Sequence, residues 1–340
     1  MNAFAPVEAL TVRVAGPGDR AAIRAFVEAQ PDATPFHLPE WSEAIGRGCG
    51  QHSLTLVAER GGRIAGLLPL THVRSPLFGS ALVSTGFGVE GGVLGQEADA
   101  LAEAAWRLAE DRACSSVELR GGPIPTGWAR KEGLYHGFAR DLPQDDEAIL
   151  KTIPRKQRAE VRRALSFGLD VTVNRDTAAH YRVYSESVRN LGTPVFPRAL
   201  FEAVLDGLDT DVLTVSRDGT PLASVLTLYF RGTVYPYWGG GTRDARSARA
   251  NELMYFELMR HAARRGCTRF DFGRSKAGTG AFAYKKNWGF EPRPLVYAIK
   301  GEARETNPLS PKYRLQVAAW KKLPLWLANR LGPPIARGLG

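Results

Sequence analysis

The chain repeats one order of secondary-structure elements, and such a repeat constrains the fold more than any single motif does. Residues 54–122 and 211–275 each predict a β-hairpin, a third strand that runs into a glycine-rich bend, a helix and a closing strand. The hairpin turns fall at residues 60–62 and 217–219, where glycine accommodates the positive φ of a tight turn. We therefore expect two α/β units built on the same plan.

Three strands, a glycine bend, a helix and a further strand resemble the core of the GNAT acyltransferase fold. The resemblance implies an α/β (α+β) fold with tandem GNAT-like domains, whose mixed and mostly antiparallel sheets are flanked by helices. A chain of 340 residues also exceeds what one hydrophobic core usually organises. The predicted divisions are a first GNAT-like domain at 1–143, a basic helical connector at 144–168, a second GNAT-like domain at 169–306, and a basic amphipathic C-terminal tail at 307–340.

The composition narrows the classes of protein that fit. Cys49, Cys114 and Cys267 are far apart and odd in number, so neither a zinc site nor a disulfide framework is expected. No apolar stretch approaches the roughly 18 residues of a spanning helix, and the N-terminus lacks a signal-peptide pattern, so we expect a cytoplasmic protein. The net charge of +10 favours an anionic partner, such as nucleic acid, a nucleotide-linked substrate or an acidic membrane surface. A soluble basic protein without such a partner also fits.

The predicted connector is strongly basic. From Arg155 to Arg163 the sequence has five basic residues and one acidic residue. On a helix, Arg155, Arg158 and Arg162 share one face, and their guanidinium groups present forked donors that match phosphate oxygens. The stripe predicts either a grip on the phosphates of an acceptor substrate or a solvated helix face.

GNAT enzymes place a Gln/Arg-x-x-Gly-x-Gly/Ala turn before the corresponding helix, and its backbone N–H groups bind the pyrophosphate of acyl-coenzyme A. Here residues 243–248 read RDARSA, with Arg246 in place of the first glycine. A side chain there would crowd a pyrophosphate, which weakens acyl-coenzyme A as the donor without excluding it. In the preceding strand, Tyr235 and Tyr237 are expected to face a groove between the domains and Trp238 the opposite side, although aromatic residues in strands are also typical of a core.

The tandem layout and three segments resemble the Fem family of peptidoglycan-bridge aminoacyl transferases: RKQRAEVRRAL at 155–165, FDFGRS at 270–275 and YKKNWGF at 284–290. The tail at 307–340 looks like that of one subgroup of this family. The similarity covers nearly the whole chain and is closer to the FemAB-related proteins that accompany PEP-CTERM/exosortase and exopolysaccharide systems. It implies a transferase that moves an aminoacyl or related acyl group onto an amine of a nucleotide- or lipid-linked sugar or muropeptide precursor. The implied donor is aminoacyl-tRNA or acyl-coenzyme A, with no tightly bound cofactor. The sequence shows no heptad run for the coiled-coil arm that several Fem transferases associate with tRNA.

The family's Phe-Lys dipeptide matches Tyr284-Lys285, and this match implies that Lys285 stabilises negative charge on the attacked carbonyl. The chemistry agrees, because an amine that attacks an ester produces an oxyanion, which a fixed cation stabilises by several kcal/mol in a dry site. Asp271, in the closing strand, is a candidate base for the amine proton, although an ion pair with Arg269 or Arg274 would explain it equally well. The predicted substrate-binding residues are Arg155, Arg158, Arg162, Tyr235, Tyr237, Arg274 and Tyr284.

The stretch after Arg274 contains glycines but lacks the Gly-x-x-x-x-Gly-Lys-Ser/Thr order of a phosphate loop. We expect residues 275–280 to form a flexible crossing. The aromatic-basic segment that follows, at 284–290, is not expected to be a clear helix.

The tail has six basic residues and no Asp or Glu after Glu305. Because tryptophan and leucine are interleaved with these cations, the tail predicts either a segment that rests on an anionic membrane surface or a terminal helix packed on the second domain. The first alternative would place the protein at the inner face of the membrane. Two other functions fit the sequence: an acyl-coenzyme A-dependent N-acetyltransferase of an amino sugar, and a non-catalytic scaffold of an exopolysaccharide system.

Overall fold

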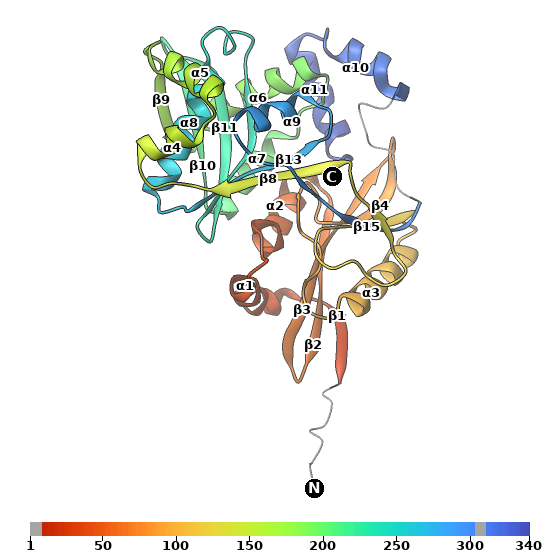
Figure 1. Cartoon of the computed structure of the whole chain (residues 1–340). Coiled ribbons are helices and arrows are strands. Elements are labelled where there is room, and N and C mark those ends of the chain that lie inside the picture. The colour runs from red at the N-terminus through yellow and green to blue at the C-terminus, as the bar shows by residue number, and fades with distance from the viewer. Residues whose placement is uncertain (1–8, 303–310) are drawn as a thin grey trace.

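The computed structural model describes residues 9–302 and 311–340, which form two sheets flanked by helices (Figure 1). The first repeat comprises β1 (Leu10–Val14), α1 (Arg20–Ala29), α2 (Pro39–Cys49), β2 (His52–Arg60), β3 (Arg63–Ser75), β4 (Gly79–Ser84), β5 (Leu94–Gly95), α3 (Ala98–Asp111) and β6 (Ser116–Arg120). The second comprises β9 (Asp170–Asn174), α6 (Thr177–Leu191), α7 (Arg198–Gly207), β10 (Thr210–Arg217), β11 (Thr220–Phe230), β12 (Thr233–Gly241), α8 (Ala250–Arg264) and β13 (Arg269–Lys276).

The remaining elements lie between and after the two repeats. β7 (Ala129–Lys131), β8 (Tyr135–Asp141), α4 (Asp146–Thr152) and α5 (Arg155–Leu165) connect them. The chain then continues through α9 (Gly280–Asn287), β14 (Arg293–Pro294), β15 (Tyr297–Gly301), α10 (Arg314–Trp320) and α11 (Leu325–Ala336).

Apart from the short strand β5, which pairs with β3 alone among the described strands, the two repeats share one order of elements, which confirms the predicted internal repeat. The sheet orders also correspond position by position: β1-β2-β3-β4-β6-β15-β7 in one sheet and β9-β10-β11-β12-β13-β8-β14 in the other. β4–β6 and β12–β13 are parallel pairs, whereas the other described pairs are antiparallel. The hairpin turns contain Gly61-Gly62 and Asp218-Gly219, all at positive φ as expected. The predicted α/β (α+β) class with mixed, mostly antiparallel sheets is therefore confirmed.

Each sheet receives its sixth strand from outside its own repeat. β8 precedes the second repeat and pairs with β13, whereas β15 follows that repeat and pairs with β6 of the first sheet. The domain boundaries at residues 143 and 168 remain predictions. β8 and β15 each pair with a strand on the other side of these boundaries. The boundary at 306 lies outside the described residues. Because separating the two units would break both pairings, the exchange ties the sheets together.

The segment after Arg274 is not the loop that the sequence predicted. β13 stays paired with β8 as far as Lys276, and α9 begins only a few residues later. Thr279 caps this helix, because its hydroxyl accepts a hydrogen bond from the N–H of Phe282 at 3.3 Å. The aromatic-basic segment is therefore helical in its first part, and the prediction was wrong here.

An apolar cluster joins the two units. Trp41 on α2 stacks against Trp238 of β12 with ring centroids 6.0 Å apart, and Phe201 on α7 packs edge-on against the same Trp238 at 4.9 Å. α2 and α7 lie so close that a Cβ added to Gly48 would be 2.3 Å from Cα of Leu200. The two halves thus share a core.

We predict that Gly48→Ala destabilises the protein by at least about 2 kcal/mol, because the backbone of Leu200 would have to move. Gly46→Ala in the same helix is the matched control. The added Cβ there would meet nothing closer than a carbonyl oxygen at 3.7 Å. It should leave stability unchanged or raise it by up to about 1 kcal/mol, through helix propensity. Chemical denaturation measures both values, and equal effects of the two substitutions would contradict this account of the interface.

Candidate active site

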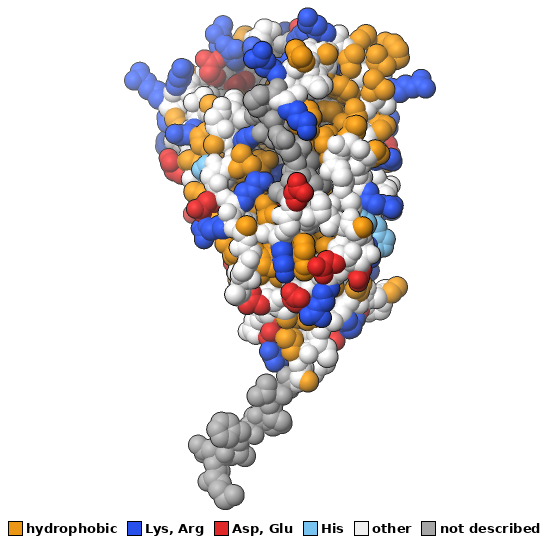
Figure 2. All heavy atoms as spheres, turned by 90° about the vertical axis from the view of Figure 1, so that its right-hand side faces the viewer, with side chains coloured by type: hydrophobic (Ala, Val, Ile, Leu, Met, Phe, Trp, Pro, Cys, Tyr) orange, Lys and Arg blue, Asp and Glu red, His pale blue; other side chains and the backbone are white. Residues whose placement is uncertain are grey.

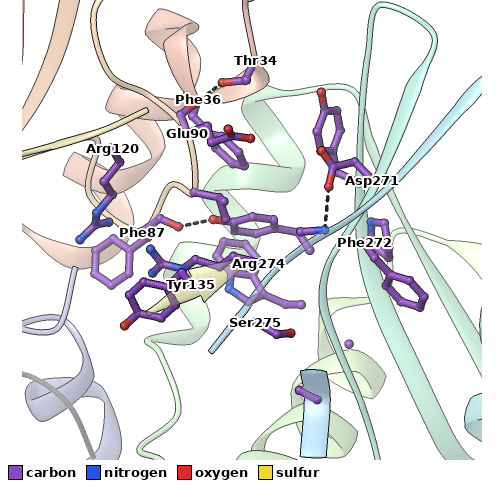
Figure 3. A pocket seen from close by; sticks show the side chains of 18 of the residues that line it. Thr34, Phe36, Phe87, Glu90, Arg120, Tyr135, Asp271, Phe272, Arg274 and Ser275 are labelled. Atoms are coloured by element: carbon purple, nitrogen blue, oxygen red, sulfur yellow. Dashed lines mark hydrogen bonds between the residues drawn. The ribbon is translucent and has the colours of Figure 1, made fainter. Parts of the chain in front are cut away.

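A cavity of about 510 Å³ lies where β12 and β13 separate. The two strands pair at two positions, the second joining Val234 to Phe270, and then diverge. Residues 235–239 of β12 line one side and residues 271–275 of β13 line the other (Figure 3). Side chains of the first unit, such as Glu90, close the cavity from above in this view. The candidate site therefore lies between the two repeats.

Tyr235 and Tyr237, which were expected at a groove between the domains, both line the cavity, and their role in binding a substrate stays a prediction. The expected alternation fails at the next residue, because Tyr237 and Trp238 both contact Trp41, with ring centroids 5.4 and 6.0 Å apart. A bulge explains the difference: the register of β12 against β11 shifts between Pro236 and Trp238, so Tyr237 is the extra residue. Its hydroxyl donates a hydrogen bond to the carbonyl of Phe87, which also lines the cavity.

Lys285 enters the cavity from α9. Its Nζ donates to the carbonyl oxygens of Gly273 and Arg274 at 3.2 and 2.9 Å, and lies over the rings of Phe138 and Phe272. Burial lowers the pKa of Lys285 to about 7, against the opposing attraction of a nearby carboxylate. An ammonium has three donors, so two bonds to the backbone leave one for a substrate atom. This lysine can act near neutral pH as a positioned cation.

Asp271 is the carboxylate whose attraction opposes this shift in the pKa of Lys285, and it lines the same cavity. It accepts a hydrogen bond from the N–H of Gly273 at 2.8 Å, and burial raises its pKa even though Lys285 and two arginines favour the charged form. The alternative ion pairs are absent among the described residues, since Arg269 pairs with Asp141 and Arg274 donates to the hydroxyl of Tyr297. A buried carboxylate whose pKa is raised can accept a proton at neutral pH.

Sequence reasoning missed a second carboxylate, that of Glu90. It lies in the glycine-rich bend of the first repeat and accepts two hydrogen bonds from Arg293 at 3.0 and 3.2 Å. Burial raises the pKa of Glu90, Arg293 counteracts this, and Asp271 adds to the increase. The sequence feature that could have indicated Glu90 is that it is the single acidic residue in the glycine-rich stretch 86–95.

Arg120 was also missed, although the repeat could have pointed to it. It ends β6, the strand that corresponds to β13, and it lines the cavity. Its guanidinium donates to Glu118 at 2.8 Å and to the carbonyls of Thr85 and Gly88. Arg120 thus fixes the loop that carries Glu90.

A second cavity, of about 810 Å³, adjoins the first. Both are lined by Tyr255, Phe272, Ala281 and Lys285, so these residues form a shared wall. The second cavity is basic, and its cations are Arg243, Arg246, Lys285 and Lys321. Four buried oxygen atoms on its lining have no hydrogen-bond partner within residues 9–302 and 311–340, and they belong to Asn190, Thr242, Asn251 and Tyr284. Tyr284 therefore lines the second cavity, whereas Arg274 lines the first.

The bend before α8 is not an open cradle for a pyrophosphate. The N–H groups of Arg246, Ala248 and Arg249 already donate to carbonyls within the bend. The side chains of Arg243 and Arg246 line the second cavity instead. In this bend, the guanidinium groups of Arg243 and Arg246 can therefore bind a phosphate, whereas these three amides cannot.

The three arginines predicted to bind phosphate lie on α5 and line neither cavity. Arg155 and Arg162 are exposed. Arg158 is half-buried and donates to the carbonyls of Lys151 and Ile153, each at 3.1 Å, so it braces the turn between α4 and α5. Their role in binding an acceptor stays a prediction.

Over the described parts of the chain, no group of three or more His, Cys, Asp or Glu residues is arranged to hold a metal ion. Cys49, Cys114 and Cys267 are buried free thiols. None of the helices in residues 9–302 and 311–340 is long and apolar enough to span a membrane.

Comparison with known proteins agrees with this architecture. Residues 150–286 match the family model of the acetyltransferase (GNAT) domain. The crystal structure of FemX is similar over 84% of this chain and 96% of its own, with 16% identity and a TM-score of 0.64. A tandem GNAT protein from the clavulanic acid biosynthesis pathway is similar over 86% of this chain and 98% of its own, with 13% identity and a TM-score of 0.55.

A third structure is the C-terminal domain of a proposed lysylphosphatidylglycerol synthetase from Agrobacterium fabrum. It is similar over 84% of this chain and 92% of its own, with 13% identity and a TM-score of 0.55. The chain has no significant match among curated proteins. The structures establish the tandem GNAT fold, which confirms the predicted fold class.

Proposed function

We propose that the protein is an acyltransferase that joins an aminoacyl or other acyl group to an amine of a cell-envelope precursor. The observation that carries this proposal is the position of Lys285 in the wall shared by two cavities. The first cavity has three carboxylates, among them Asp271 and Glu90, and three cations besides Lys285, whereas the described residues that line the second include cations and no acidic side chain. An amine held beside carboxylates and an anionic donor can thus meet at one lysine.

In this proposal, the amine binds in the first cavity. An ammonium group would be attracted by Asp271 and Glu90, and the aromatic rings of Tyr235 and Tyr237 would pack against its carbon skeleton. Asp271 takes a proton from the amine, which then attacks the carbonyl carbon of the donor. A C–N bond forms and the bond to the donor's sulfur or oxygen breaks. The nitrogen then loses a second proton, which passes to the leaving group, and Asp271 releases the first proton to solvent.

Lys285 would stabilise the oxyanion that forms on the attacked carbonyl. Its two bonds to the carbonyls of Gly273 and Arg274 hold Nζ in place, so the ammonium need not reorganise during the reaction. The surrounding rings of Phe138 and Phe272 exclude water and strengthen the interaction.

The donor would lie in the second cavity. Arg243, Arg246 and Lys321 can bind phosphates of acyl-coenzyme A or of the 3′ end of an aminoacyl-tRNA. The match of residues 150–286 to the acetyltransferase domain favours acyl-coenzyme A, whereas the resemblance to the Fem family favours aminoacyl-tRNA. For the acceptor, a muropeptide and an exopolysaccharide precursor with an amino sugar both supply the required amine.

We predict that Lys285→Ala abolishes formation of the acylated precursor in cells. Removing a fixed donor to an oxyanion lowers the rate about 100- to 1000-fold. Mass spectrometry should therefore show, in deletion cells that carry this variant, a precursor lighter by one acyl substituent. Cells that carry the wild-type gene should contain the heavier species.

Lys286→Ala is the matched control, because Lys286 is exposed and lines neither cavity. It should restore the acylated precursor at the wild-type level. Immunoblots and the thermal midpoints of the purified variants confirm that both proteins are folded. Full restoration by Lys285→Ala would support the alternative of a non-catalytic scaffold.

We also predict that a phosphate-bearing donor raises the thermal midpoint of the purified protein, and that Arg246→Ala reduces this shift at least by half. Acyl-coenzyme A and aminoacyl-tRNA are tested separately, so the ligand that stabilises the protein identifies the donor. Arg155→Ala is the control on α5 and should leave the shift unchanged. The proposal that the donor binds in the second cavity would be contradicted if neither donor raised the thermal midpoint. It would also be contradicted if Arg155→Ala, and not Arg246→Ala, reduced the shift.

A further inference from the structure

The last turn of α6 and the helices α10 and α11 carry an exposed apolar surface. Its largest side chains are Leu191, Leu315, Trp326 and Leu331, which are 69%, 79%, 68% and 44% exposed. In Figure 2, hydrophobic side chains gather in the upper part of the face on which α10 lies, beside several Lys and Arg side chains. Exposed apolar groups of this size, close together on a surface, are typical of an interaction site.

The two helices are anchored on the second unit, so this surface is fixed in place. The guanidinium of Arg189 on α6 donates to the carbonyl of Leu323 at 2.9 Å, and the amide of Asn329 on α11 donates to the hydroxyl of Ser185 at 3.3 Å. A Cβ on Gly332 would lie within 3.1 Å of Val195. The inner side of the tail is therefore packed on the second unit, as one sequence-based alternative expected, while its outer side stays exposed.

The charged side chains of residues 311–340 are all basic. Residues 311–340 contain no Asp or Glu, and the cations among them are Lys312, Arg314, Lys321, Lys322, Arg330 and Arg337. Trp326 and Arg330 are both exposed and lie about one helical turn apart on α11. Apolar and cationic groups thus share one face of this helix.

We infer that this surface, formed by α10, α11 and Leu191, docks on an anionic membrane. A bilayer whose headgroups carry negative charge complements both parts of it, because tryptophan and leucine insert at the headgroup level while lysine and arginine pair with phosphates. A second copy of the chain is a poorer occupant, since two such surfaces would bring together cations without any acid of residues 311–340 to offset them.

The position of this surface links it to both cavities. Lys321, just after α10, lines the second cavity, and Leu339 and Gly340, just after α11, line the first. A lipid-linked substrate held at the membrane would therefore be presented beside the cavity mouths. This consequence rests on the proposed function, whereas docking itself does not require catalysis.

Cosedimentation of the full-length protein with vesicles tests the inference. The protein should bind vesicles that mix phosphatidylcholine with phosphatidylglycerol, bind pure phosphatidylcholine at least roughly tenfold more weakly, and lose binding as salt screens the headgroup charge. Trp326→Glu should weaken binding to the mixed vesicles at least roughly tenfold. Because Trp326 is exposed, the thermal midpoint of this variant should equal that of the wild type.

Val173→Glu is the matched control. Val173 is 40% exposed on the edge strand β9, so it receives the same change of charge outside the surface proposed to dock. It should keep wild-type binding within about twofold. Lys285→Ala should also bind like the wild type, so a failure of docking is distinguishable from a failure of catalysis. Equal binding of the vesicles by Trp326→Glu and Val173→Glu would overturn the inference. So would the finding that the wild-type protein forms a dimer without lipid and that Trp326→Glu dissociates this dimer.

Discussion

The separation of β12 from β13 is the constraint on which the site depends. Backbone groups in a sheet normally bond to the neighbouring strand, but these two strands stop pairing after Val234 and Phe270. Further along β13, side chains take over part of that role: Lys285 donates to the carbonyls of Gly273 and Arg274, and Asp271 accepts from the N–H of Gly273. The side chains that form hydrogen bonds with the backbone of β13 are thus the same ones that we propose to carry out the reaction.

Burial then tunes these two groups in opposite directions. It lowers the pKa of Lys285 to about 7 and raises the pKa of Asp271, while their mutual attraction opposes both shifts. Both changes move the groups toward neutral pH, where proton transfer is efficient. The apolar cluster around Trp41 fixes the first unit against β12, so the loop with Glu90 reaches the same cavity. The reaction that we propose for residues of the second repeat thus depends on the packing of the first repeat against the second.

The sequence predicted the features that rest on local pattern. The hairpin turns at Gly61-Gly62 and Asp218-Gly219 need positive φ, which the glycines in the sequence indicate. The internal repeat was recognised with the help of these turns. Lys285 came from resemblance to a family, because a lysine beside an aromatic residue carries little information by itself. The exchange of β8 and β15 and the bulge at Tyr237 depend on pairing between distant segments. Glu90 was missed for the same reason, since only the fold brings it opposite Asp271.

The pH dependence of kcat/KM for acyl transfer tests the central claim most directly, once the acceptor is identified. If Lys285 acts as a cation, the rate should fall as pH rises through about 7, because the lysine loses its charge. Lys285→Arg should retain activity at alkaline pH, since a guanidinium stays protonated. A wild-type rate that rises through pH 7 while Lys285→Arg remains inactive at every pH would contradict the account, because the lysine would then be acting as a base.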